Sequence, residues 1–305
     1  MAFTAADVKN LREMTGVGMM DCKKALAATD GDMDKAVEFL REKGLAASAK
    51  KAGRIAAEGM AYATVINGIG VVVEVNAETD FVGKNEKFVD FVKGVAATVA
   101  KEKPADLDAL MACKYADTDH TVTEQQQEMV LVIGENIKVR RFAFFTEGVS
   151  VAYVHAGGKI GVLVNLDTDL TAEQVEEMGK DAAMQIAALN PRFWDKAQVT
   201  EDVLENEKKI MLAQMANDPK MANKPEQVRE KIVVGKLNKF YTENCLLQQE
   251  FVKDNDLTVE KYLNAAAKAL GGKVTFKDAV RFEKGEGIEK KQENFAAEIA
   301  SMVKG

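Results

Sequence analysis

The chain has 305 residues, with 41 Lys and Arg against 48 Asp and Glu and a net charge of −7. Its length predicts two folded domains with room for a small third, and its acidic balance disfavours bulk attraction to nucleic acid or to an anionic membrane. The 3 cysteines and 2 histidines lack metal-ligand spacing, and no apolar run approaches the roughly 18 residues that cross a bilayer. The first residues show neither a signal core nor an Arg-rich presequence, so we expect a cytoplasmic protein without a cofactor or metal of its own.

Three short helices are predicted at the start of the chain. Thr4 and Asp7 form a capping-box pattern ahead of an apolar helical face. Residues 15–18 contain Gly-Val-Gly and break this helix; because they follow a helix and not a strand, we interpret them as a turn and not as a dinucleotide site. A second helix is predicted over 19–28, and Asp32 is placed to cap a third.

A β-hairpin follows. Two β-branched runs, 62–66 and 69–75, flank Asn67-Gly68, the dipeptide typical of a type I′ turn. Helical periodicity then predicts a helix over 86–100. The segment 123–133 predicts another helix with a Thr-x-x-Gln cap at Thr123 and Gln126, followed by a strand over 137–145.

The hairpin recurs about 90 residues later, which indicates a duplicated unit. EGMAYATV at 58–65 corresponds to EGVSVAYV at 147–154, and IGVVVEV at 69–75 corresponds to IGVLVNL at 160–166. A second helix is predicted over 173–189. Each copy predicts a small antiparallel sheet covered by helices on one face, which is an α+β fold.

These patterns divide the chain into five predicted units. The Ala-, Lys- and Gly-rich segment 44–59 is predicted to be a linker that is partly helical at most. The inserted unit predicts two charged antiparallel helices, either an interaction arm or a structural buttress. A last amphipathic helix is predicted over 287–303. The units are 1–54, three helices and linker; 55–146, the first half of the core; 147–200 with 242–283, the second half; 201–241, the helical hairpin; and 284–305, a C-terminal helical module.

Motifs for covalent chemistry are missing from the sequence. It contains no GxxxxGK[ST], GxSxG or HExxH pattern and no kinase motif. With so few histidines, acid–base chemistry would rest on carboxylates. We therefore expect a protein that is not an enzyme in the bond-making sense, with carboxylate chemistry as the remaining enzymatic alternative.

One short segment stands out instead, Thr79-Asp80-Phe81-Val82, between a hairpin strand and a helix. The duplicate at 168–171 reads Thr-Asp-Leu-Thr, so it keeps Thr-Asp but lacks the aromatic residue. We interpret the Thr-Asp pair as a structural turn. Phe81 has two open interpretations, packing into the core or filling a pocket of a partner protein.

Four blocks of the sequence together resemble the bacterial elongation factor Ts family, the guanine-nucleotide exchange factors of elongation factor Tu. The resemblance covers essentially the whole chain. In chain order the blocks are LREMTGVGMMDCKKAL at 11–26, TDFV at 79–82, IGENIKVRRF at 133–142 and RFEKGEGIEK at 281–290. It implies a ubiquitin-associated-like N-terminal domain, a duplicated core, a helical-hairpin (coiled-coil) arm and a C-terminal helical module.

The resemblance also implies which residues contact the partner. Asp80 and Phe81 would insert near the magnesium site of elongation factor Tu, with Thr79 and Val82 setting the loop. The N-terminal domain would dock on the GTPase domain through Met19, Met20 and Lys23. His155 in the second hairpin would contact another domain of the partner, although an exposed hairpin-tip residue without a role is the simpler interpretation.

Three further points stay open at this level. The stoichiometry of the complex with elongation factor Tu is one-to-one or two-to-two, and the protein alone could form a homodimer. We expect no direct contact with nucleic acid or with a membrane. The alternative function is a protein-binding adaptor with a ubiquitin-associated-like domain and no exchange activity. Such an adaptor would give Phe81 no role.

Overall fold

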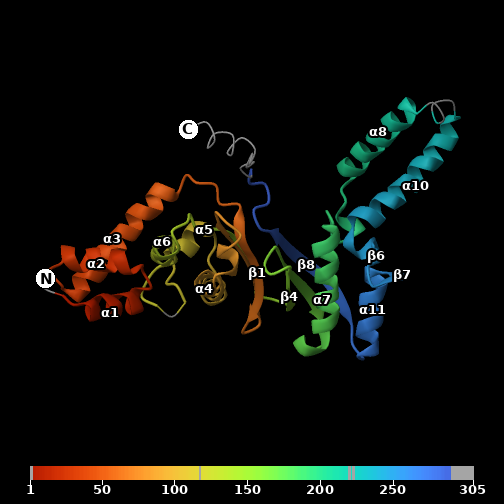
Figure 1. Cartoon of the computed structure of the whole chain (residues 1–305). Helices are drawn as coiled ribbons and strands as arrows, with labels where there is room; N and C mark the ends of the chain where they lie inside the picture. Colours follow the sequence, from red (N-terminus) through yellow and green to blue (C-terminus); the bar gives the residue numbers. More distant parts are fainter. Residues whose placement is uncertain (1–2, 117, 219–220, 222–223, 290–305) are drawn as a thin grey trace.

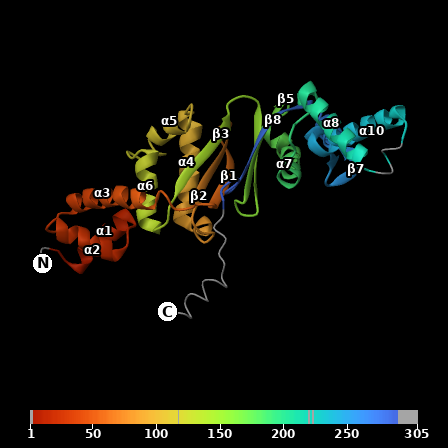
Figure 2. The ribbon, with the colours of Figure 1, turned by 90° about the horizontal axis from the view of Figure 1, so that it is seen from above.

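The computed structural model describes residues 3–116, 118–218, 221 and 224–289. The chain has a mixed α and β architecture with small antiparallel sheets. Viewed from above, the N-terminal helices, the two halves of the core and a helical hairpin follow one another along the molecule (Figure 2). Within these residues no helix is both long enough and apolar enough to cross a membrane.

Three helices form the N-terminal unit: α1 (Ala5–Thr15), α2 (Met19–Ala28) and α3 (Met33–Lys51). The predicted capping box of Thr4 and Asp7 is present, and Asp32 caps α3 as predicted. Their apolar faces meet in a small core of Val8, Leu11, Val17, Cys22, Ala25, Leu26, Ala36 and Leu40.

Helix α3 extends well into the segment predicted as a linker. It runs to Lys51 and packs along α6 (Val122–Ile133) of the core. Gly44 lies at this contact: a Cβ there would be 3.4 Å from the carbonyl oxygen of Gln127, which is an ordinary van der Waals distance. Arg41 Nη2 also pairs with Glu124 Oε1 at 3.0 Å. The N-terminal unit is therefore joined to the core by a helix packed against it and not by a loose tether.

The first half of the core is a sheet in the order β1-β2-β3 with helices on one face. The predicted Asn67-Gly68 turn joins β1 and β2, with both residues at positive φ. The cap of α6 is Thr121 with Glu124, two residues before the predicted Thr123 and Gln126, and α5 was not predicted. The elements are β1 (Glu58–Ile66), β2 (Ile69–Ala77), the 3₁₀ turn η1 (Val82–Lys84), α4 (Glu86–Glu102), α5 (Leu107–Ala112), α6 and β3 (Lys138–Phe145).

The second half repeats this plan with the sheet order β4-β5-β8, so the predicted duplication is present in the fold. Its main helix, α7, packs on β4 and β5 as α4 packs on β1 and β2. The elements are β4 (Val149–His155), β5 (Ile160–Thr168), α7 (Ala172–Leu189), η2 (Lys196–Gln198), η3 (Leu246–Gln248), β6 (Glu250–Phe251), β7 (Asp254–Thr258), α11 (Val259–Ala269) and β8 (Val274–Glu283).

The two sheets pack against each other through an apolar cluster. The interface centres on Ala61, Ala63, Val72, Leu163 and Phe282. A Cβ at Gly70 would lie 2.4 Å from Ser150 Oγ, so the sheets approach more closely there than an alanine allows. Local sequence patterns predicted the sheets, but not that each one covers the other.

Helices α8 (Glu201–Asn217) and α10 (Glu226–Asn244) form the predicted antiparallel hairpin, which projects from the second half (Figure 1). Its base is fixed by Val199, Phe240 and Cys245, which are buried together. Farther along the hairpin, Ile210 and Val234 are 42% and 60% exposed.

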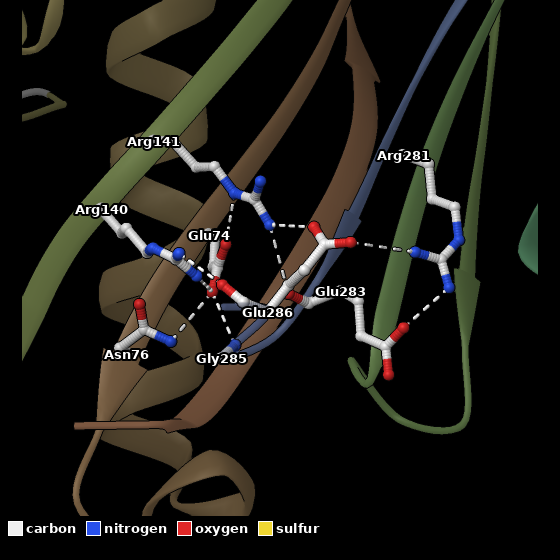
Figure 3. A network of polar contacts seen from close by, with 8 residues as sticks. All are labelled: Glu74, Asn76, Arg140, Arg141, Arg281, Glu283, Gly285 and Glu286. Atoms are coloured by element: carbon white, nitrogen blue, oxygen red, sulfur yellow. Dashed lines mark hydrogen bonds and ion pairs between the residues drawn. The ribbon is translucent and has the colours of Figure 1, made fainter. Parts of the chain in front are cut away.

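A network of charged groups ties β2 and β3 to the turn after β8 (Figure 3). Glu74, fully buried, accepts hydrogen bonds from Arg140 Nη1 at 2.9 Å, Asn76 Nδ2 at 3.0 Å and the Gly285 N–H at 2.7 Å. Arg141 Nε donates to the second oxygen of Glu74. The network thus fixes the point at which the chain leaves β8. The helix predicted over 287–303 lies outside the described residues from 290 onward, and residues 284–289 form a turn and irregular chain.

Candidate functional site

The loop between β2 and α4 presents Phe81 to solvent. Phe81 is 81% exposed, while its neighbour Val82 is 6% exposed and belongs to the core of the first half. Gly83 lies so close to β1 that a Cβ there would be 2.8 Å from the carbonyl oxygen of Gly59. Asn85 then caps α4 through the N–H groups of residues 87 and 88. The loop is therefore anchored just after an unpacked aromatic side chain, and of the two interpretations of Phe81 core packing is wrong.

The same loop is held on its other side by Glu135, a residue that the sequence patterns did not single out. Glu135 Oε2 accepts the N–H groups of Glu78 and Thr79, each at 3.0 Å, and Oε1 accepts the Thr79 hydroxyl at 2.6 Å. In return, Glu78 Oε1 accepts the Asn136 N–H at 2.6 Å. The only available signal was the position of Glu135 within the block IGENIKVRRF.

The duplicated loop in the second half is held in the opposite way, because its own side chains bind the backbone of another segment. Thr168 Oγ1 donates to the Lys273 carbonyl oxygen at 2.6 Å, and Asp169 Oδ1 accepts the Lys273 N–H at 2.7 Å. Leu170, at the position of Phe81, packs against the core of that half. The threonine side chain is hydrogen-bonded in both copies. The predicted structural role of the Thr-Asp pair is therefore confirmed in the second copy, where Asp169 also takes part, and in the first copy only for Thr79.

A groove of about 400 Å³ lies between this loop and the N-terminal unit. Phe81 lines one side of it and Gly18 the other, and Lys87 Nζ bridges the two sides by donating to the Gly16 carbonyl oxygen at 3.1 Å. Met19 and Met20 follow Gly18 directly and are 50% and 63% exposed. Lys23, one turn further along α2, is exposed as well. The structure therefore brings Gly18, the residue before α2, and the Phe81 loop to one groove, while Met19, Met20 and Lys23 are not among its lining residues.

His155 lies away from this groove, at the exposed end of β4. Its Nδ1 is 3.0 Å from the Tyr153 hydroxyl. The turn that follows rests on the first half of the core, because the Ala61 N–H donates to the Gly158 carbonyl oxygen at 2.8 Å. His155 does not line the groove, so the structure does not join it to Phe81 in one site.

The thiols lack the features of nucleophiles. Burial raises the pKa of Cys22 and Cys113 above the ordinary thiol range and raises the pKa of Cys245 to about 11. Each of the three is therefore a neutral thiol near pH 7. Among the described residues no three His, Cys, Asp or Glu side chains gather closely enough to hold a metal ion.

Known proteins resemble this chain over nearly its whole length. The family described as "Elongation factor TS" matches residues 78–286. The chain is 48% identical to elongation factor Ts of Syntrophotalea carbinolica over 307 residues, covering 100% of both chains. It is 50% identical to elongation factor Ts of Trichlorobacter lovleyi over 312 residues, covering 99% of both. With elongation factor Ts of Clostridium perfringens strain SM101 it shares 50% identity over 303 residues, covering 98% of both.

Proposed function

The chain belongs to the elongation factor Ts family of translation elongation factors, and on that basis we propose that it accelerates the release of GDP from elongation factor Tu. The observation that carries this proposal is that Phe81 is 81% exposed on an anchored loop. An aromatic side chain presented in this way fills a partner's pocket with little further loss of conformational freedom.

The mechanism is a coupling between two binding equilibria. A GTPase holds GDP through backbone amides and a magnesium ion that bridges phosphate to protein oxygens. Phe81 with the exposed Asp80 would displace the elements that order this ion, which leaves the phosphate charge less compensated. The coupling is reciprocal, so an incoming nucleotide weakens the exchange factor's hold by the same factor. No covalent bond forms, and the GDP and magnesium belong to the partner.

The other parts of the chain would supply docking surface. We assign the N-terminal unit as a ubiquitin-associated-like domain that contacts the GTPase domain through Met19, Met20 and Lys23. His155 would contact another domain of the partner. The reaction belongs to the cytoplasm, where translation takes place.

Release of a fluorescent GDP from elongation factor Tu tests the proposal directly. Substoichiometric amounts of the protein are expected to accelerate release, because each molecule leaves when new nucleotide binds and then acts again. Stable binding to elongation factor Tu without faster release would refute exchange and support the adaptor alternative. Absence of binding to elongation factor Tu would refute exchange and leave an adaptor for another partner.

Met20→Ala tests the docking role of α2. Its exposed side chain would be buried on binding, so truncation is expected to raise the Kd for elongation factor Tu about fivefold, which corresponds to about 1 kcal/mol of lost apolar burial. Met14 on α1 is 59% exposed and makes a matched control as Met14→Ala. Equal Kd values for the two variants would contradict the assignment.

A further inference from the structure

We propose that Glu135 is a positioning residue that pre-forms the Phe81 loop for partner binding. The inference rests on the proposed exchange function and assigns a role to a residue outside the TDFV segment. Glu135 would touch neither nucleotide nor magnesium; it acts through the backbone of residues 78 and 79.

The contacts are concentrated on one carboxylate. Glu135 receives three hydrogen bonds from two consecutive loop residues, two from backbone N–H groups at 3.0 Å and one from the Thr79 hydroxyl at 2.6 Å. Bonds to an ionised acceptor are stronger than those between neutral groups. They fix the chain two residues before Phe81, and the buried Val82 fixes it one residue after.

The support for Glu135 is itself rigid. Gly134 ends α6 in the left-handed conformation, and Ile137 is buried. Asn136, the residue directly after Glu135, is 7% exposed and donates from Nδ2 to the Arg54 carbonyl oxygen at 2.7 Å. The carboxylate therefore starts from a turn that is fixed before any partner arrives.

The duplicated loop shows what this arrangement achieves. In the second half, the loop's own Asp169 reaches out to the N–H of Lys273, just before β8. In the first half the direction is reversed: the carboxylate comes from the turn before β3 and the loop supplies the N–H groups. Asp80 and its counterpart Asp169 are both exposed, but the loop of the first half is held by Glu135, whereas Asp169 itself holds the second loop. The side chains of Asp80 and Phe81 are thus free for a partner while the backbone stays ordered.

The first test is independent of exchange activity. Hydrogen–deuterium exchange of the free Glu135→Ala protein is expected to rise for backbone amides of residues 78–82 and to stay unchanged in the buried part of α4, residues 88–99. The Glu135→Gln variant, with a single acceptor oxygen, should show a smaller rise over 78–82. Unchanged protection of 78–82 in Glu135→Ala overturns the proposal.

The second test measures GDP release. Glu135→Ala is expected to slow it roughly tenfold, because a misplaced loop loses the productive contact geometry. In a Phe81→Ala background the same substitution should add no further slowing, since Glu135 acts through Phe81 and its loop. Asp169→Ala, the matched substitution in the second copy, should leave the rate unchanged.

The outcomes separate the two proposals. If the wild-type protein fails to accelerate release, the exchange function is refuted, and protection of residues 78–82 still decides the positioning role. If the wild type accelerates release and Glu135→Ala matches it, the positioning role is refuted. Equal slowing by Glu135→Ala in the presence and absence of Phe81 also overturns the proposal, because Glu135 would then act elsewhere.

Discussion

Replacing Phe81 by alanine is expected to slow GDP release from elongation factor Tu about 30-fold, the equivalent of about 2 kcal/mol and typical of a central interface anchor. The affinity for GDP-bound elongation factor Tu should fall less, because the docking surface around α2 remains. Release of fluorescent GDP gives the rate, and a binding titration gives the affinity. If GDP release with Phe81→Ala were as fast as with the wild type, Phe81 would not drive exchange, and exchange would depend on the docking surfaces instead.

Stability separates this effect from misfolding. Phe81 is 81% exposed, so its truncation should change the free energy of unfolding by less than about 0.5 kcal/mol. The control is Leu170→Ala, at the same position of the second copy, where the side chain packs against the core. That substitution should lower stability and leave the rate of GDP release unchanged. The two copies of one loop therefore predict opposite phenotypes.

Removing the carboxylate of Glu74 is expected to cause the largest loss of stability. Glu74→Ala leaves Arg140, Arg141 and the Gly285 N–H without their buried acceptor. Breaking such a cluster typically costs 3–5 kcal/mol, and we expect about 3 kcal/mol here because both arginines keep some contact with water. Urea unfolding at pH 7 measures it. A loss below about 0.5 kcal/mol, as expected for the exposed Glu147→Gln control, would contradict the role of the network.

The same carboxylate makes stability depend on pH. Burial opposes ionisation of Glu74, but hydrogen bonds from Gly285, Asn76, Arg140 and Arg141 outweigh it and hold its pKa below 4.5. A pKa lowered by folding contributes stability above the unfolded-state value and loses it as the pH falls through the folded-state value. The wild type should therefore lose stability more steeply below about pH 4.5 than Glu74→Gln does. Parallel pH profiles for the two proteins would contradict this.

The elements that sequence predicted best are those fixed by neighbouring residues. The bounds of α2, the caps of α1 and α3, and the Asn67-Gly68 hairpin all follow from signals a few residues apart. The cap of α6 was misplaced because the spacing of Thr121 and Glu124 is the same as that of Thr123 and Gln126, and only packing decides between them.

What sequence could not predict depends on contacts between distant segments. The face-to-face packing of the two sheets joins residues such as Ala61 and Leu163, which no local pattern links. For the same reason Glu135 was missed, since it lies 56 residues from Thr79 in the chain. The TDFV segment was found from its place between a strand and a helix, and the internal repeat showed that the fold does not require its phenylalanine. Whether Phe81 points inward or outward required the structure.

The packing of α3 along α6 has a consequence for how a partner is held and released. Because this joint is not a loose tether, the start of α2 and the Phe81 loop are held at a fixed distance from each other, and under the proposed function they would be two contact points for one partner. Once one of these regions is bound, the other would bind at a high effective concentration, so the overall affinity would exceed that of either contact alone. The fixed distance would also act on release, because a GTPase that changed shape on taking up nucleotide would lose both contacts together. One complex could then combine a high affinity before nucleotide uptake with rapid, complete dissociation after it.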